Sequence, residues 1–283
     1  MSLLGTAIEA GTAAAVHAVA DADPAPPAPS SERTPAAPAR PLPLPGRFEL
    51  RTASATLADG VDVAVPFEAF TSGRFGVTRL LLSTAADPRR QTLSLALRTA
   101  RRTVLETASV HALQRLFSRP LAAPFLVPTN DVLTATVAAA GAEGAGLLRI
   151  GAQGLSAEQL DVVADRLPSP EVILLARRVT VPAGATTFGV RFESRGVDLA
   201  VRRIAASTVD PAQDHAIGLT LNGRQGTELA ELSPAQLDEL FRDSAATPPI
   251  PFASGFATTV SVDNPTETDA VLSIVVEAYP VDA

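Results

Sequence analysis

Three histidines, His17, His111 and His215, are the side chains of this sequence best suited to acid–base catalysis near neutral pH. They lie in an alanine-rich N-terminal segment, in a segment with a helical pattern and in a loop rich in aspartate. Neither their spacing nor their neighbours indicate a base that is held by an orienting acid. We therefore predict surface or capping histidines and no enzymatic activity.

Metal and phosphate sites are not indicated either. The sequence has no cysteine and no HxH, HExxH or paired-carboxylate helix, so we predict no metal and no cofactor. The glycine-rich segment 141–146 precedes a strand instead of linking a strand to a helix, which favours a hairpin or loop over a phosphate-binding loop. Asp263–Asp269 could supply oxygens to calcium. Because the matching part of the other repeat lacks the acids, a polar turn is the preferred interpretation.

The basic side chains that could bind a partner are arginines, since the sequence contains no lysine. Arg89, Arg90, Arg101 and Arg102 cluster near predicted loop tips. The net charge is −7, tryptophan is absent and tyrosine occurs once, so neither a phosphate backbone nor stacked bases have a suitable surface. We predict that these four arginines contact other proteins and that the chain does not bind nucleic acid.

The N-terminal segment, residues 1–23, is apolar and rich in alanine, which predicts a helix. A signal peptide is disfavoured because no basic residue precedes the apolar run and Glu9 lies inside it. A membrane span is not favoured, because Glu9 and His17 would lie in hydrocarbon. We prefer an anchoring helix that docks in a groove of a partner protein. The apolar residues predicted to make this contact are Leu3, Leu4, Ile8, Val16 and Val19.

The next segment, residues 24–46, has nine prolines among residues 24–45. This composition favours an extended polyproline II conformation over a packed core. The segment is predicted to be a spacer between the anchoring helix and the rest of the chain, and a flexible tail without a partner is the alternative.

An internal repeat organises the remainder of the sequence. Residues 97–117 match residues 221–241 without gaps at an offset of 124, and Gly60 and Gly184 share this offset. We predict two copies of one domain, residues 47–155 and 171–283, joined by a helical linker at 156–170. The residues of the first copy that recur in the ungapped match are Leu97, Thr103, Leu105, Ser109, Leu113, Leu116 and Phe117.

Within each copy the hydrophobic residues mostly alternate, as they do in half-buried antiparallel strands. Segments 61–67, 93–97 and 132–137 show this pattern, and the second copy repeats it. Seven or eight short strands per copy without strand–helix alternation predict an all-β protein of two tandem antiparallel β-sandwiches. A jelly roll is the preferred topology.

Each copy also contains one short helix. At 232–241, Ser233 and Gln236 form a capping box and Pro234 suits the first helical position. Leu237, Leu240 and Phe241 are then expected to form one apolar face. The counterpart at 109–117 keeps the cap and the apolar residues, so we predict that each helix covers the open end of its sandwich. A third capped segment, 155–167, is predicted to fix one domain against the other.

This arrangement resembles virion structural proteins, in particular phage capsid-associated and double jelly-roll proteins. The segment from Arg115 to Val137, RLFSRPLAAPFLVPTNDVLTATV, has the proline-bounded connection before a Thr/Val strand that is common in such proteins. The resemblance implies a minor capsid, penton, spike or decoration protein located in the virion. It also implies other capsid or virion proteins as partners and a homo-oligomer, with a trimer preferred.

Two other classes compete with this interpretation. A bacterial surface or secreted adhesion module could use its sandwiches to bind a glycan or protein while the N-terminal segment holds them at a cell. An enzyme ranks third, because no segment supplies a nucleophile, a base and an oxyanion site together.

Overall fold

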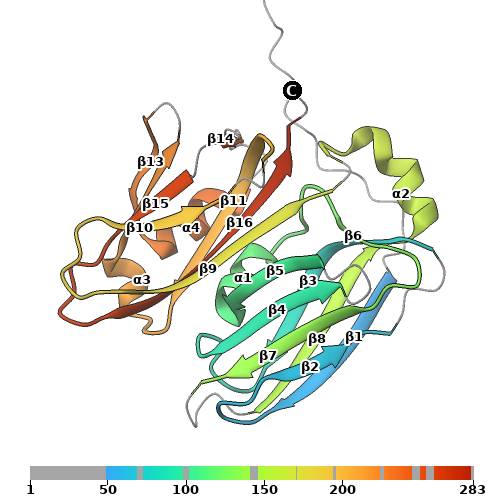
Figure 1. The fold of residues 1–283 in the computed structure, drawn as a ribbon, viewed down its shortest axis with the longest axis horizontal. Coiled ribbons are helices and arrows are strands. Elements are labelled where there is room, and N and C mark those ends of the chain that lie inside the picture. The colour runs from blue at the N-terminus through green and yellow to red at the C-terminus, as the bar shows by residue number, and fades with distance from the viewer. Residues whose placement is uncertain are drawn as a thin grey trace, which may run out of the picture. The chain divides into compact units, whose positions relative to one another are not determined.

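The computed structural model describes residues 49–68, 73–97, 102–140, 146–169, 171–193, 196–223, 226–243, 249–252 and 258–281. The predicted anchoring helix with its five apolar contact residues, the proline-rich spacer and Arg101 lie outside this part of the chain. In the described residues, strands alternate with turns and a few short helices (Figure 1).

Among the described residues, eight strands come from the first copy of the repeat and eight from the second. Those of the first copy are β1 Glu49–Leu57, β2 Val63–Pro66, β3 Phe75–Thr84, β4 Gln91–Leu97, β5 Arg102–Ser109, β6 Phe125–Val127, β7 Leu133–Ala139 and β8 Gly146–Leu155. Those of the second copy are β9 Ile173–Val181, β10 Phe188–Phe192, β11 Leu199–Thr208, β12 Gly218–Gly223, β13 Gly226–Leu232, β14 Ile250–Phe252, β15 Thr258–Asp263 and β16 Ala270–Pro280.

The helical segments are short. They are α1 Val110–Leu116, α2 Ala157–Val163, α3 Gln213–Ala216 and α4 Pro234–Leu240, with 3-10 turns at Ala164–Arg166 and Phe241–Asp243. The three predicted caps are confirmed: Ser109, Ser156 and Ser233 each accept a hydrogen bond from the first turn, and Ser156 and Ser233 complete capping boxes with Gln159 and Gln236. None of the helices among the described residues is long and apolar enough to cross a membrane.

Each copy folds into two four-stranded antiparallel sheets with the same strand order. The first has β1-β8-β3-β6 and β2-β7-β4-β5, and the second has β9-β16-β11-β14 and β10-β15-β12-β13. Adding eight to every strand number of the first copy gives the second. Eight strands in two such sheets form a jelly roll. The predicted all-β fold of two tandem sandwiches is confirmed, and it is a double jelly roll.

Local irregularities recur as well. The pairing of β3 with β8 shifts register between Val77 and Arg79, and that of β11 with β16 shifts between Val201 and Arg203. Gly60 and Gly184 both adopt the left-handed conformation, with φ of 69° and 67°. β-bulges and positive-φ glycines depend on local backbone chemistry. Their recurrence at an offset of 124 therefore supports a duplication.

The ungapped match fails at one end. In the structure Leu95 pairs with Leu105 and Leu221 pairs with Leu229, so Leu221 is the counterpart of Leu95 and the predicted match with Leu97 is wrong. A shift of two residues keeps every side chain on the same face of a strand, so the sequence pattern looks the same in both registers.

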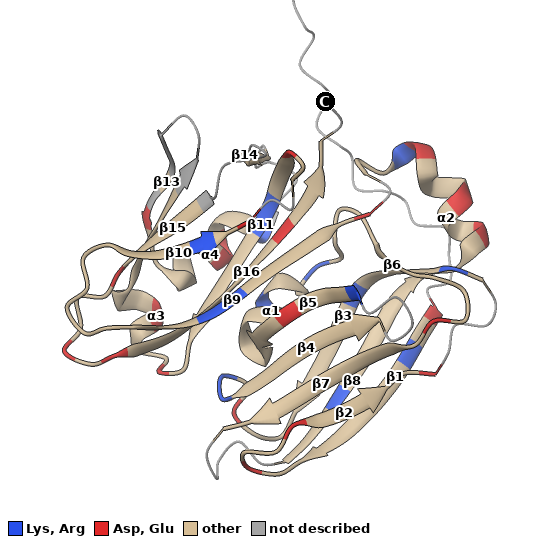
Figure 2. Ribbon diagram, viewed as in Figure 1, with Lys and Arg blue, Asp and Glu red and all other residues tan. Residues whose placement is uncertain are grey.

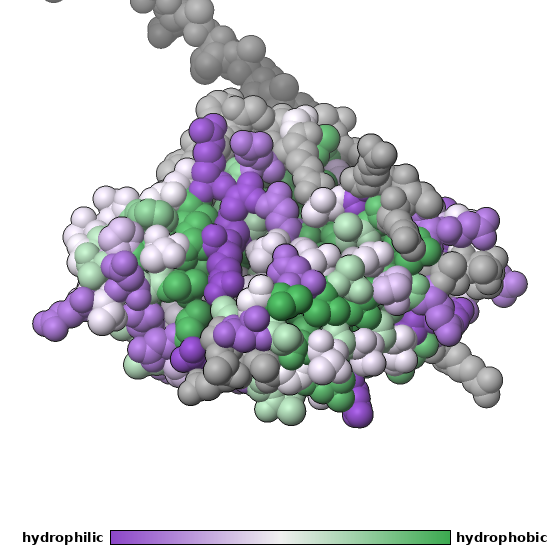
Figure 3. All heavy atoms as spheres, turned by 60° about the horizontal axis from the view of Figure 1, so that its bottom comes forward, coloured by the Kyte–Doolittle hydropathy of each residue, from purple (hydrophilic) through white to green (hydrophobic). Residues whose placement is uncertain are grey.

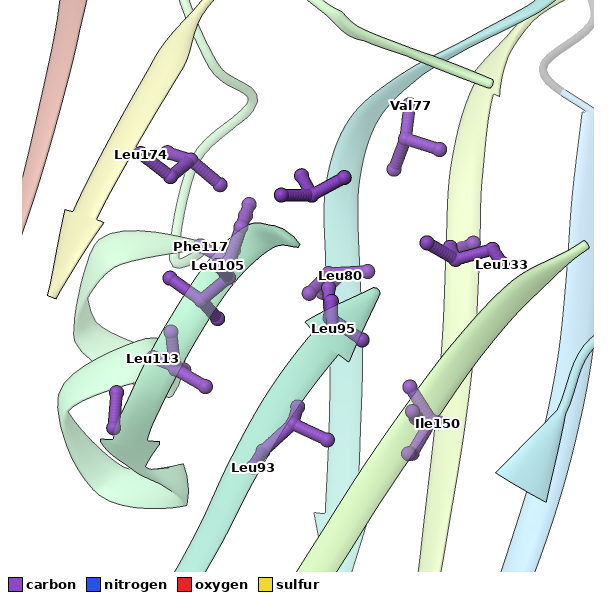
Figure 4. Close-up of a cluster of buried hydrophobic side chains, with 14 of the residues drawn as sticks. Val77, Leu80, Leu93, Leu95, Leu105, Leu113, Phe117, Leu133, Ile150 and Leu174 are labelled. Carbon is purple, nitrogen blue, oxygen red and sulfur yellow. The ribbon is translucent and has the colours of Figure 1, made fainter. Parts of the chain in front are cut away.

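The core of the first sandwich gathers inward-facing leucines and phenylalanines from both sheets and from α1 (Figure 4). Leu113 of α1 and Phe117, which directly follows this helix, lie in it, and their counterparts Leu237 and Phe241 are buried in the second core. Leu240 is different, because 38% of it is exposed whereas Leu116 is 1% exposed. The predicted apolar face of α4 is therefore only partly buried.

Candidate functional site

The two sandwiches meet through one surface, here called the interdomain interface. It joins α1, β5 and the chain that follows α1 to the outer side of the sheet formed by β9, β16 and β11. α1 contacts β3 of its own sandwich and β11 and β16 of the second. α1 covers the core of its own sandwich, as predicted, and it also packs against the second sandwich, which was not predicted.

The apolar part of this interface continues the first hydrophobic core. Leu174, Ala205 and Val275 belong to the second sandwich but are buried in the cluster formed by the first. Figure 4 shows Leu174 reaching from β9 toward Phe117 and Leu105. Because the two sandwiches share buried apolar surface, separating them would expose it to water.

A buried carboxylate, Asp214, marks one edge of the interface. Its Oδ2 accepts hydrogen bonds from Arg89 at 2.9 Å and Arg115 at 2.8 Å, both from the first sandwich. Its Oδ1 accepts from the backbone N–H and the hydroxyl of Thr208, each at 2.7 Å. Four donors thus surround one carboxylate, and two of them carry charge from the other sandwich.

These donors determine the charge state of Asp214. Burial alone would raise the pKa of this carboxyl, but the hydrogen bonds from Thr208 and the charges of Arg115 and Arg89 together lower it below its ordinary value. Asp214 is consequently ionised at neutral pH, and the two arginines are paired with it across the interface.

His111 lies beside this cluster at the start of α1. Burial lowers its pKa to about 4, with further lowering by Arg89 and Arg115. Its Nε2 is buried and has no hydrogen-bond partner among the described residues. The prediction of a surface or capping histidine is wrong for His111, which is a neutral, half-buried group at the interface. His215 is exposed, as predicted.

Three serines meet at the interface where β5 ends and α1 begins. The Ser109 hydroxyl lies 2.7 Å from that of Ser207, and the Ser109 N–H donates to the Ser273 hydroxyl at 2.8 Å. The Arg115 guanidinium donates to the Ala206 carbonyl at 2.5 Å. These short polar contacts fix the position of α1 on β11 and β16 because each needs a defined geometry.

A second buried ion pair lies at the other edge. Arg203 pairs with Glu277 within the second sandwich, and both side chains are almost completely buried. Glu277 accepts from the N–H of Ala122 at 2.6 Å, and Arg203 donates to the Pro120 carbonyl at 3.0 Å. The pair therefore also binds the backbone of the chain that follows α1.

The structure gives intrachain partners to three of the four arginines predicted to contact other proteins, and Arg101 lies outside the described residues. Arg89 pairs with Asp214, Arg102 pairs with Glu171, and Arg90 lies 3.8 Å from Asp87. Contact of these side chains with a second protein stays a prediction. Figure 2 shows that most strand residues carry no charge and that the charged ones are spread over both sandwiches.

The segment Asp263–Asp269, for which a polar turn was preferred over a calcium site, is a polar turn. Asn264 is buried and donates to the carbonyls of Val181, Pro182 and Thr268, while its own side-chain oxygen accepts from Thr266. Asp269 accepts from the N–H of Ala183. No group of three or more metal-ligating side chains occurs among the described residues.

Sequence reasoning missed the acids of the interface. Asp214 and Glu277 carry no local motif, and their partners are remote in the chain. The counterparts of Ser207 and Ser273 at the offset of 124 are Ser83 and Arg149, which are exposed, so the repeat does not indicate a buried interface at these positions. The interdomain interface holds the two jelly rolls in one relative orientation through buried apolar side chains and directed polar contacts.

No family model and no curated protein matches the sequence. Among solved structures, a chain from the atomic structure of Sulfolobus Turreted Icosahedral Virus is 11% identical with a TM-score of 0.46, covering 83% of this chain and 91% of that one. The major capsid protein P2 from bacteriophage PM2 is 12% identical with a TM-score of 0.44, covering 84% and 98%.

A third structure, the CUB1-EGF-CUB2 domain of human MASP-1/3, is 8% identical with a TM-score of 0.22 and covers 80% of this chain and 99% of that one. All three TM-scores lie below 0.5, so the double jelly roll is assigned from the strand order.

Proposed function

We propose that this chain is a non-enzymatic structural protein of a virus particle, which builds or attaches to the capsid. The observation that carries the proposal is the double jelly roll whose two halves are locked together by the interdomain interface. Jelly rolls are typical of viral capsid domains and of lectins. A pair held in one fixed orientation is suited to building a regular shell, because every copy presents the same surfaces to its neighbours.

The lectin-like alternative, a surface or secreted adhesion module, has less support. Sugars are commonly bound on aromatic side chains, and the sequence has no tryptophan and one tyrosine. The single tyrosine, Tyr279, is partly buried at the end of β16, where it does not form an exposed platform.

The proposal includes the partners of the chain. These are other virion proteins and further copies of the same chain, with a trimer preferred. Residues 1–23 would attach the protein to a partner in the particle, through the apolar side chains named above, and residues 24–46 would serve as the spacer.

Mass spectrometry and electron cryomicroscopy of particles purified from a culture that expresses the chain test this function. We expect the chain in the particles at a fixed ratio to the other structural proteins, with symmetric density for two jelly rolls. Its absence from the particles, together with binding to a glycan array, would instead favour the adhesion module.

A further inference from the structure

A pocket of about 410 Å³ lies at the interdomain interface and is lined by both α1 and α4. The first sandwich contributes residues of α1 and of the chain that follows it, and the second contributes residues of β11, of α4 and of the turn at Phe241–Asp243. We call it the arginine pocket, because its lining includes Arg115, Arg119, Arg203 and Arg242. Its volume is within the range of small-molecule sites.

The charges of the arginine pocket are not balanced within the chain. Two of its arginines, Arg115 and Arg203, take part in the buried ion pairs described above. Arg119 and Arg242 are exposed, and no ion pair joins either of them to an acid in the part of the chain that the structure describes. Asp238 is the one acid among the lining residues. Two unpaired guanidinium groups thus share the pocket with a single carboxylate, which leaves an excess of positive charge in a chain whose net charge is −7.

The position of these charges matters more than their exposure. Hydrophilic side chains are spread over the face drawn in Figure 3, so an exposed arginine does not by itself indicate a binding site. Arg119 and Arg242 differ because they line the same concave space, one from each sandwich. The apolar residues Leu116, Ile204 and Phe241 also line it. A concave site with apolar walls concentrates the field of its charges and attracts counter-ions.

The jelly-roll fold does not require the arginines of this pocket. At the offset of 124, Arg115, Arg119 and Arg242 correspond to residues without positive charge, namely Glu239, Asp243 and Ser118. The C-terminus of a helix favours a nearby cation, but the segments after α1 and α4 carry their arginines at different positions. The basic lining is therefore a feature of this pocket and not of the duplicated domain.

The lining suits an oxyanion of the phosphate type. A guanidinium group can donate two parallel hydrogen bonds to the oxygens of a phosphate, and it is charged at neutral pH. Because Arg119 and Arg242 come from different sandwiches, an anion with oxygens on two sides can accept hydrogen bonds from both. The pocket is larger than one tetrahedral ion, so a compact polyvalent anion such as pyrophosphate suits it better than a single phosphate.

We propose that the arginine pocket binds a free, compact and polyvalent oxyanion of the phosphate type. Arg119 and Arg242 bind its oxygens, whereas Arg115 and Arg203 position the walls of the pocket, because their own donors are engaged within the chain. Asp238 opposes the negative charge of the ligand and limits its affinity. The bound anion joins the two sandwiches and so stabilises the interdomain interface. This inference goes beyond the proposed function and does not depend on it.

Isothermal titration calorimetry of the full-length chain with inorganic pyrophosphate, at pH 7 and low ionic strength, tests the site. Arg119→Gln and Arg242→Gln should each raise the dissociation constant at least tenfold, because each removes a charged donor. Asp238→Asn should lower the dissociation constant, because it removes the opposing charge. Arg166→Gln is the matched control and should leave the constant unchanged, since Arg166 is exposed on the 3-10 turn after α2 and does not line the pocket.

Thermal unfolding gives a second readout. A ligand that binds only the folded chain stabilises it, so pyrophosphate should raise the melting temperature of the wild-type chain and of Arg166→Gln. The melting temperature of Arg242→Gln should stay nearly unchanged. Without pyrophosphate the two variants should melt at similar temperatures, because both positions are exposed, and this separates a loss of binding from a loss of folding.

Three results would overturn the proposal. The first is a wild-type chain that binds no pyrophosphate at millimolar concentration. The second is equal weakening by Arg166→Gln and Arg242→Gln, because the attraction would then be general to exposed arginines. The third is binding to vesicles that contain phosphatidic acid, dependent on Arg242 and without binding of free pyrophosphate, which would assign the pocket to a lipid headgroup instead.

Discussion

Replacing Asp214 by asparagine should loosen the interdomain interface without changing its shape. Asparagine has nearly the same size but carries no charge, so Arg89 and Arg115 would remain half-buried without a counter-charge. Removing one partner of a buried ion pair costs about 3–5 kcal/mol. Because asparagine keeps one oxygen that can accept from Thr208, we expect a loss of about 3 kcal/mol in the free energy of unfolding.

The assay is urea unfolding at pH 7, followed by far-ultraviolet circular dichroism, with Asp161→Asn as the matched control. Asp161 pairs with Arg74, but both side chains are largely exposed, so this change should cost less than about 1 kcal/mol. Raising the salt concentration should reduce the effect of the control and leave the effect of Asp214→Asn almost unchanged. Equal losses in the two variants would refute the view that Asp214 holds the sandwiches together.

Three further changes test the groups around the fold. His111 stays neutral in the folded chain at pH 5, whereas a histidine in the unfolded chain protonates near pH 6.5. Lowering the pH from 6.5 to 5 should therefore reduce the free energy of unfolding by about 1 kcal/mol, after allowance for the partial exposure of His111. His111→Gln should abolish this loss. Gly154→Ala should lower the free energy of unfolding by about 3 kcal/mol, because the new Cβ would collide with the backbone oxygen of Gly76 in β3. Gly189→Ala should be tolerated, because the nearest atom to its new Cβ would be 3.4 Å away. Thermal unfolding of the two variants distinguishes these outcomes. Gly60→Ala and Gly184→Ala should each lower the free energy of unfolding by about 1 kcal/mol. Both positions have positive φ, and no atom lies within 4 Å of the new Cβ, so the loss comes from the backbone conformation alone. Unequal losses in urea unfolding would argue against equivalent turns.

Local chemistry explains which parts of the fold could be predicted from the sequence. A cap is made by side chains and backbone a few residues apart, so the signals at Ser109, Ser156 and Ser233 were sufficient. Alternating hydrophobic residues likewise identified the strands, since inward and outward positions differ in every sandwich. The order of the strands in each sheet depends on pairing between distant segments and came only from the structure.

Local sequence patterns could not predict the interdomain interface. Arg89 and Asp214 are 125 residues apart, and nothing near either residue indicates the other. His111 was predicted to be a surface or capping histidine because neither its spacing nor its neighbours in the sequence indicate a partner, yet the second sandwich packs against α1. Leu97 was wrongly matched to Leu221 because the loop between β4 and β5 is longer than the loop between β12 and β13. The resulting two-residue shift keeps the alternation of hydrophobic and polar residues, so the sequence does not reveal it.

α1 and α4 differ in charge at one position that faces the interdomain interface. Arg115 of α1 pairs with Asp214. Its counterpart in α4 at the offset of 124 is Glu239, which would meet the same acid if α4 took the place of α1, and like charges disfavour that exchange. The change from a basic to an acidic residue at equivalent positions therefore favours α1 over α4 on the outer side of the sheet formed by β9, β16 and β11.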